Sequence, residues 1–165
     1  MDRRERVARL GRQVTRELAT STMLIHHGAA EMLGLNATDL TCLDLLHKAV
    51  MPLTPVNLAE LTGLTPGAIT GVADRLEAAG FVNRVRSTSD RRRWELQLAP
   101  DRQGDEDALY APLTTAITDL CRQYDDDQLK VVADFLTKLG PVLDVEAHRL
   151  RRRASRHGQP TRAGA

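Results

Sequence analysis

The fold is decided by residues 54–98, which read TPVNLAELTGLTPGAITGVADRLEAAGFVNRVRSTSDRRRWELQL. It holds two Thr-Pro pairs, Thr54-Pro55 and Thr65-Pro66. In each pair a hydroxyl that can cap a helix stands directly before a proline. Proline suits the first helical position because its φ is already helical and its missing N–H would have no partner there. The stretch therefore predicts two helices in close succession.

Glycines set the lengths of these two helices. Gly63 and Gly80 can each take the positive φ that ends a helix. They predict a helix of residues 55–62 and a second of about residues 66–79. In the second helix the apolar residues recur at helical spacing and form a buried side, which consists of Ile69, Val72, Ala73 and Leu76. The two helices and their tight turn indicate a helix-turn-helix.

After Gly80 the apolar period changes to two. Residues 81–85 and 94–98 flank an arginine-rich tip, and both segments suit half-buried strands of a hairpin. A hairpin behind a helix-turn-helix is the winged-helix arrangement. We therefore expect a mainly α fold with a small β-hairpin, in which N- and C-terminal helices for dimerisation flank a winged helix-turn-helix domain.

The second helix and the hairpin resemble the MarR family (multiple antibiotic resistance regulators). The resemblance is carried by LEAAGFV at residues 76–82, Arg84, SDRR at residues 89–92 and LQL at residues 96–98. Thr70 and the DRL of residues 74–76 match the family's recognition-helix pattern, and the DRR of residues 90–92 matches its wing signature. The sequence departs from the family at Ser87-Thr88, where Asp-Pro is frequent, and at Ala99-Pro100, where a threonine is frequent.

The resemblance extends over about residues 33–98 in motif and over nearly the whole chain in layout. It implies a homodimeric transcriptional regulator, often a repressor, that binds a palindromic operator in double-stranded DNA and is released by a small ligand or an oxidant. The alternative is a winged helix that serves protein–protein contacts without specific DNA binding. Salt-dependent binding to the promoter region of its own gene would distinguish the two.

On the second helix, the side expected to meet DNA is built mainly from small residues. It consists of Thr65, Gly67, Ala68, Thr70, Gly71 and Arg75. Small residues allow a close approach to the bases but supply few bidentate base contacts. We expect Ala68 against a thymine methyl and the threonine hydroxyls on phosphates or bases. For Arg75 two roles stay open, a phosphate contact and an ion pair.

Much of the affinity is therefore expected from the wing, through Ser87, Thr88, Arg91, Arg92 and Arg93. One of these arginines can enter the minor groove, where narrow A·T tracts concentrate negative potential. Asp90 is expected to pair with a neighbouring arginine and to position the tip. The net charge of the chain is only +1, but residues 84–93 hold five arginines against one acid. Charge sorted into such blocks can present a basic face to phosphates.

Outside the winged helix, apolar residues recur at helical spacing in long segments. In the first helix, which ends near Gly34, they are Val7, Leu10, Val14, Leu18, Ile25, Ala29 and Met32. After the hairpin two further helices are expected, with bends at Pro112 and Pro141 or a late start of the first. One winged helix cannot cover so much apolar surface, so a two-fold dimer is expected rather than a monomer with a larger core.

These expectations divide the chain into four parts. Residues 1–33 form an N-terminal dimerisation helix, residues 34–99 the DNA-binding winged helix-turn-helix, and residues 100–152 the C-terminal dimerisation helices. Residues 153–165 form a basic disordered tail. The tail either strengthens DNA binding through phosphates or acts only as a solubilising end.

A sensor site is the least specified feature. His26, His27 and His47 are candidates for a ligand pocket between the flanking helices and the winged helix, where the family often holds aromatic or phenolic anions. His27 and Glu31 have the spacing of two metal ligands but lack a third, so no metal is expected. Cys42 lies in an apolar helix and should have a raised thiol pKa, which disfavours a peroxide sensor.

Other function classes leave no pattern in the sequence. We find no glycine-rich phosphate loop, nucleophile elbow or His-Glu-x-x-His pair, so neither an enzyme nor a cofactor is expected. The two cysteines, of which Cys121 is expected in the core, suggest no disulfide framework. No apolar run approaches the ~20 residues needed to span a bilayer, and the first residues do not resemble a signal peptide. A cytoplasmic location is therefore expected.

Overall fold

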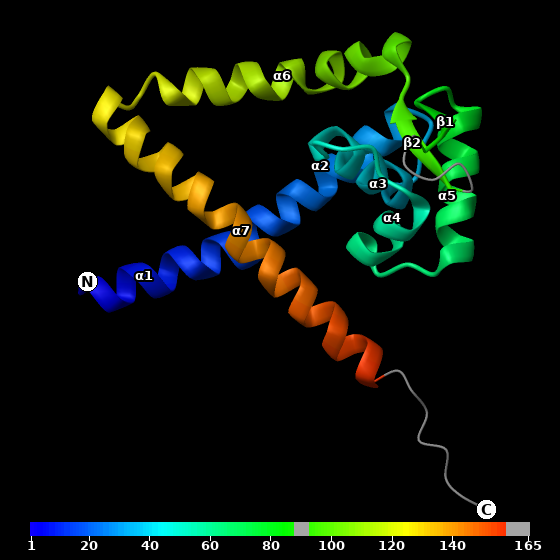
Figure 1. Cartoon of the computed structure of the whole chain (residues 1–165). Helices are drawn as coiled ribbons and strands as arrows, with labels where there is room; N and C mark the ends of the chain where they lie inside the picture. The colour runs from blue at the N-terminus through cyan, green and yellow to red at the C-terminus, as the bar shows by residue number, and fades with distance from the viewer. Residues whose placement is uncertain (88–92, 158–165) are drawn as a thin grey trace, which may run out of the picture. The chain divides into compact units, whose positions relative to one another are not determined.

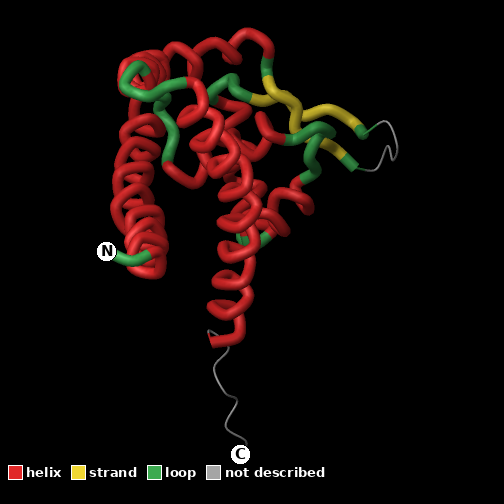
Figure 2. Tube along the Cα trace, turned by 90° about the vertical axis from the view of Figure 1, so that its left-hand side faces the viewer, coloured by secondary structure: helices red, strands yellow, loops and turns green. Residues whose placement is uncertain are grey.

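The computed structural model describes residues 1–87 and 93–157, apart from the side chains of Gln103, Glu106 and residues 155–157. It is mostly helical with a small antiparallel sheet, as expected (Figures 1 and 2). Contacts among its residues divide the chain into two units, residues 1–109 and 110–165. The four-part division expected from the sequence stays a prediction.

The first unit begins with a continuous helical rod, drawn in blue in Figure 1. It consists of α1 (Arg3–Arg12), a π-helical segment (Gln13–Leu18) and α2 (Ala19–Met32). Asp2 caps its start, where the Asp2 carboxylate accepts a hydrogen bond from the Glu5 amide at 2.7 Å. The rod ends at Leu33 and Gly34, whose φ is +71°. Its expected end near Gly34 is thus confirmed.

Three short helices follow, and the caps of the second and the third match the sequence prediction. They are α3 (Ala37–Lys48), α4 (Pro55–Thr62) and α5 (Pro66–Ala78). Asn36, Thr54 and Thr65 cap their starts, each accepting a hydrogen bond from the amide three residues on. The turn after α4 uses Gly63 at φ +75°. The helix-turn-helix is therefore present at the predicted residues, with α5 ending one residue before the prediction.

The hairpin follows α5 directly. β1 (Val82–Arg86) pairs antiparallel with β2 (Trp94–Leu98), and the two strands form the hairpin drawn in yellow in Figure 2. In this pairing Val82 lies opposite Leu98. Leu53 forms an isolated bridge to Leu96, in which the Leu96 amide donates to the Leu53 carbonyl at 2.9 Å. Through this bridge the segment before α4 extends the small sheet on the side of β2. It ties the hairpin to the helix-turn-helix.

The core of the first unit lies between the three short helices and the hairpin. Its largest fully buried apolar side chains come from α3, α4, α5, the turn after α5 and both strands, and are Leu40, Leu43, Leu58, Ile69, Val72, Leu76, Phe81, Val82 and Leu96. Every apolar residue expected on the buried side of the second helix belongs to the core. This burial orients α5, because only one of its faces is left for contacts outside the domain.

The second unit consists of helices whose described side chains form almost no buried core. α6 (Gln103–Cys121) begins before it, preceded by a 3₁₀ turn (Pro100–Arg102), and α7 (Asp126–His157) follows. α6 starts at Gln103 and continues through Pro112, so the late start allowed for at this proline does not occur. Between Tyr110 and Ala154 no described residue is buried.

The C-terminal helix runs further than the sequence indicated. α7 continues to His157, whereas the tail was expected to be disordered from residue 153 onward. The remaining residues 158–165 lie outside the described residues. None of the helices in the described part of the chain is both long enough and apolar enough to span a lipid bilayer.

The left-handed end of α5 gives a stability prediction. Gly80 has φ +77°, and a Cβ built on it meets nothing within 4 Å, so backbone conformation alone sets the effect of a side chain there. Gly80→Ala should lower the free energy of unfolding by about 1–2 kcal/mol, the cost of a left-handed L-residue. Urea denaturation measures it.

Gly67 supplies the matched control for Gly80. It lies in α5 without a positive φ and has the same open surroundings. Gly67→Ala should leave stability unchanged or raise it by up to about 1 kcal/mol, because alanine loses less entropy in a helix than glycine. Equal stability of Gly80→Ala and the wild type would contradict this account of the turn.

Candidate nucleic-acid interface

The exposed side of α5 is shallow, in the sense that its side chains near the start of the helix are short. Gly67, Ala68 and Thr70 are exposed, and Gly71 is half-buried. The Thr65 hydroxyl accepts a hydrogen bond from the Ala68 amide at 3.2 Å and keeps its own proton for another acceptor. The Thr70 hydroxyl donates its proton to the Pro66 carbonyl at 3.0 Å, so this hydroxyl can still accept a hydrogen bond. Five of the expected recognition residues thus lie on one accessible strip at the start of the helix.

Arg75, the sixth expected recognition residue, forms an ion pair. Its Nε and Nη2 donate to the two carboxylate oxygens of Asp39 at 2.8 and 2.7 Å. The Asp39 side chain is 1% exposed and that of Arg75 is 52% exposed. The hydrogen bond to Asp39 raises the pKa of Arg75. Of the two roles left open for Arg75, the structure shows the ion pair, and a phosphate contact stays a prediction.

Asp39, the partner of Arg75, is a residue that sequence reasoning did not connect with the candidate site. It follows the cap of α3, where an acid is sufficiently explained by the positive end of the helix dipole. Nothing in the local sequence connects it with an arginine 36 residues later.

A second arginine joins the wing to α5. Arg84 of β1 forms ion pairs with Asp74 and with Glu77, whose Oε2 lies 3.2 Å from Arg84 Nε. The Arg84 guanidinium also lies over the ring of Trp94, 4.5 Å from its centre. These contacts involve both strands and the helix, so the base of the hairpin has a defined position beside α5.

The wing tip is only partly described. Thr88, Asp90, Arg91 and Arg92 lie outside the described residues, so their expected contacts are not tested. Arg93 is exposed, and its carbonyl accepts a hydrogen bond from the Ser87 amide at 3.0 Å. Ser87 is 3% exposed, so its side chain does not reach the surface where a DNA contact was expected.

A pocket of about 850 Å³ lies between α2, the start of α3 and α5. Its apolar lining includes Ala30, Leu35 and Val72, and its charged lining includes Glu31 and Arg75. Of the three histidines expected at a ligand site, only His27 lines this pocket. The pocket reaches α5 itself, so a molecule bound in it would touch the candidate interface.

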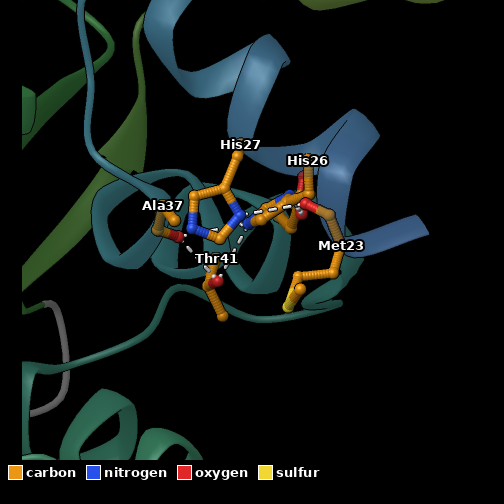
Figure 3. Close-up of polar contacts among 6 residues, drawn as sticks. Met23, His26, His27, Ala37 and Thr41 are labelled. Atoms are coloured by element: carbon orange, nitrogen blue, oxygen red, sulfur yellow. Dashed lines mark hydrogen bonds and ion pairs between the residues drawn. The ribbon is translucent and has the colours of Figure 1, made fainter. Parts of the chain in front are cut away.

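His26 reaches Ala37 and Thr41 at the start of α3 (Figure 3). Its Nε2 lies 3.1 Å from both the Ala37 carbonyl oxygen and the Thr41 hydroxyl, and its Nδ1 is 3.7 Å from Asp44. Burial raises the pKa of Asp44, and the neighbouring His26 opposes this. His26 thus ties α2 to α3.

The other two histidines have different surroundings. Nδ1 of His27 lies 2.9 Å from the Met23 carbonyl of its own helix (Figure 3). His47 is exposed and is not part of the pocket lining. Among the described residues no three His, Cys, Asp or Glu side chains are placed to hold a metal ion together.

Cys42 has the environment expected from the sequence. It is fully buried, and desolvation together with Asp39 raises the pKa of its thiol to about 11, with Arg75 acting in the opposite direction. Cys121, expected in the core, is half-buried. Both thiols are free.

Comparison with known proteins agrees with this geometry. The model of the MarR family matches residues 35–94, which include α3, α4, α5 and β1 and end at the first residue of β2. The uncharacterized HTH-type transcriptional regulator YcgE of Bacillus subtilis (strain 168) is 39% identical over 140 residues, which cover 84% of this chain and 90% of that protein.

Solved structures of lower identity share the fold. Apo MarR from E. coli is 21% identical, with a TM-score of 0.58 over 79% of this chain and 95% of that one. Tm0710 from Thermotoga maritima is 20% identical, with a TM-score of 0.59 over 84% and 96%. A mutant of S. aureus MepR, solved bound to an oligodeoxyribonucleotide, is 18% identical, with a TM-score of 0.54 over 83% and 97%.

The environment of Cys42 predicts slow chemistry. With a pKa of about 11, only about one thiol in ten thousand is ionised at pH 7, and the side chain is fully buried. In the Cys121→Ser variant, iodoacetamide should leave the native protein unmodified and should label it fully in denaturant, as followed by mass spectrometry.

The Cys42→Ser variant is the control, since it retains the half-buried Cys121. It should be labelled in the native state. If Cys42 reacted as rapidly as Cys121 in the folded protein, the burial described here would be wrong.

Proposed function

Because the chain belongs to the MarR family of transcriptional regulators, we propose that it is a homodimeric repressor that binds a palindromic operator in double-stranded DNA and is released by a small ligand. The observation that carries the proposal is the shallow exposed strip of α5, held beside a hairpin whose tip is rich in arginine. Such a protein would work on chromosomal DNA in the cytoplasm.

The proposed DNA contacts follow from the chemistry of the strip. Gly67 and Ala68 add almost no bulk, so the backbone at the start of α5 can come close to the base edges. The N-terminal amides of a helix favour phosphate oxygens, and Thr65 has a hydroxyl proton to donate at this end. Ala68 and the methyl group of Thr70 suit the methyl group of thymine. Arg91, Arg92 and Arg93 of the wing would supply the flanking phosphate or minor-groove contacts.

A second copy of the chain would cover the apolar faces of the terminal helices. Large apolar side chains remain exposed on the rod and on the C-terminal helices, among them Leu10, Leu18, Met23, Leu24, Ile117, Leu120, Phe135, Leu136 and Val142. Helices without a single buried side chain among the described residues from Tyr110 to Ala154 have no core of their own. A two-fold dimer would also set two recognition helices about 34 Å apart, the spacing of successive major grooves.

Light scattering tests the dimer. At low micromolar concentration the full chain should have a mass twice 18.2 kDa. Phe135→Asp and Leu136→Asp together place two charges on the exposed apolar side of α7 and should shift the protein toward the monomer. Lys130→Asp is the control, because it places a new negative charge on α7 at an exposed residue that pairs with Asp127 and is not apolar. A wild type that is monomeric at this concentration would refute the proposal.

The pocket beside α5 is the proposed effector site. Its apolar walls suit an aromatic ring, and His27 and Arg75 can donate hydrogen bonds to a carboxylate or phenolate. A ligand there would touch α2, α3 and α5 together, so it could change the position of α5 relative to the rod. Salicylate and related phenolic acids are the probes to add to the operator complex described next.

DNA binding is tested by selecting duplexes from a random-sequence pool with the full chain. The proposal expects an enriched palindrome, bound with strong salt dependence. In the Arg91→Ala/Arg92→Ala variant, the slope of log affinity against log salt should fall by about 0.9 for each phosphate that the protein no longer neutralises. Fluorescence anisotropy on the enriched duplex measures it, and a phenolic effector should reduce the same signal.

The control for the wing variant is Arg122→Ala, which removes an exposed arginine of the second unit that pairs with Asp119. It should leave the slope unchanged. If no sequence were enriched, the alternative of a winged helix used for protein–protein contacts would be favoured. If the wing variant kept the slope of the wild type, the wing would have no role in phosphate binding.

A further inference from the structure

Two long polar side chains on the exposed side of α5 are already held by partners within the protein. Arg75 is bound at both ends of its guanidinium edge by Asp39. Asp74 is paired with Arg84 of β1. The Arg75 side chain is 52% exposed, but the Nε and Nη2 donors of its guanidinium face Asp39 and not solvent. The side chains that α5 can insert into a DNA groove without breaking an ion pair are therefore mainly the short ones of Ala68 and Thr70.

We propose that Asp39 is a positioning residue that keeps Arg75 away from the DNA, and so makes base recognition by α5 depend on short side chains. This inference rests on the proposed DNA-binding function and adds to it a determinant of operator specificity. Asp39 itself is 1% exposed and lies in α3, so it cannot contact DNA directly. It acts only through the arginine that it binds.

The pair has the features of a stable clamp. An arginine and a carboxylate joined by two parallel hydrogen bonds, here of 2.8 and 2.7 Å, have a defined mutual orientation. The carboxylate is the third residue of α3, where the amide groups of the first turn favour negative charge. Because Asp39 is buried, the removal of its partner would leave a charge without solvent or counter-charge, so the pair resists opening.

Gly71 provides the room for this arrangement. The Arg75 side chain runs back along α5, and a Cβ built on Gly71 would lie 3.3 Å from Arg75 Nη1. Any larger residue at position 71 would therefore press on the guanidinium in its paired position. Asp39 therefore binds the Arg75 guanidinium, and Gly71 leaves the space that the guanidinium occupies in this paired position.

A free arginine at this place would change what the helix recognises. Its guanidinium could bind O6 and N7 of a guanine or a backbone phosphate, whereas Ala68 and Thr70 favour thymine methyl groups. Asp39→Asn keeps the shape of the side chain and removes the charge that holds Arg75. The variant should therefore form an interaction with DNA that the wild type does not make.

The test compares Asp39→Asn, Asp39→Asn/Arg75→Gln and the wild type as full chains. Each is used to select duplexes from a random-sequence DNA pool, and the salt dependence of binding is measured on the wild-type selected duplex and on a duplex of arbitrary sequence. Asp119→Asn is the matched control, an acid-to-amide change at an exposed ion pair of α6.

For Asp39→Asn we expect a salt slope steeper by up to about 0.9 per subunit, or a guanine enriched at one new position in each half-site. For the double variant we expect the wild-type slope, because replacing a residue that does not touch DNA leaves the number of neutralised phosphates unchanged. A merely structural weakening would lower affinity and leave both the slope and the selected bases unchanged.

Two results would overturn the proposal. One is an Asp39→Asn variant with the wild-type slope and the wild-type selected sequence. The other is a double variant with a shallower slope than the wild type, which would mean that Arg75 already binds phosphate. In the double variant both partners of the ion pair are replaced by neutral amides, so it leaves no unpaired charge that would hinder folding. Its salt slope therefore tests whether Arg75 binds phosphate in the wild type even if Asp39→Asn does not fold. Failure of the wild type to enrich any sequence would refute specific binding separately, and the slopes on arbitrary DNA would still compare the variants.

Discussion

Along α5, the side chains of Ile69, Val72, Ala73 and Leu76 are at most 1% exposed. Burying each of the larger ones contributes about 1.5–3 kcal/mol, so α5 cannot turn about its axis without losing the burial of its three large core side chains. That constraint fixes which residues face outward. The shallow strip of glycine, alanine and threonine is accessible because the opposite side of the helix is held by α3, α4 and the hairpin.

Charge pairs complete what apolar packing begins. Packing fixes the rotation of α5, and the pairs of Arg75 with Asp39 and of Arg84 with Asp74 and Glu77 connect its exposed edge to α3 and β1. The base of the wing is thereby held against the helix. In such an arrangement the distance between α5 and the base of the wing is fixed within the domain before DNA binds, so binding does not have to bring these two elements together.

The parts of the fold that depend on neighbouring residues could be predicted from the sequence, and the parts that depend on distant residues could not. The caps Thr54 and Thr65 and the glycine turns were correct because capping and positive φ act over three or four residues. The Asp39 pair escaped prediction because its partners are 36 residues apart. His26, His27 and His47 were expected at one pocket between the flanking helices and the winged helix, whereas the structure directs His26 toward α3 and places only His27 of the three in the pocket lining.

The rod formed by α1, the π-helical segment and α2 has a mechanical consequence. At about 1.5 Å per residue, the helix from Arg3 to Met32 is roughly 45 Å long. It is seated in the winged helix only near its end, where Ala29 and Ala30 are buried and His26 reaches α3. The helix is thus anchored to the winged helix close to one of its two ends. A tilt of a few degrees there sweeps the N-terminus through several ångströms, and restraint of the N-terminus would in turn limit how far the DNA-facing domain can swing.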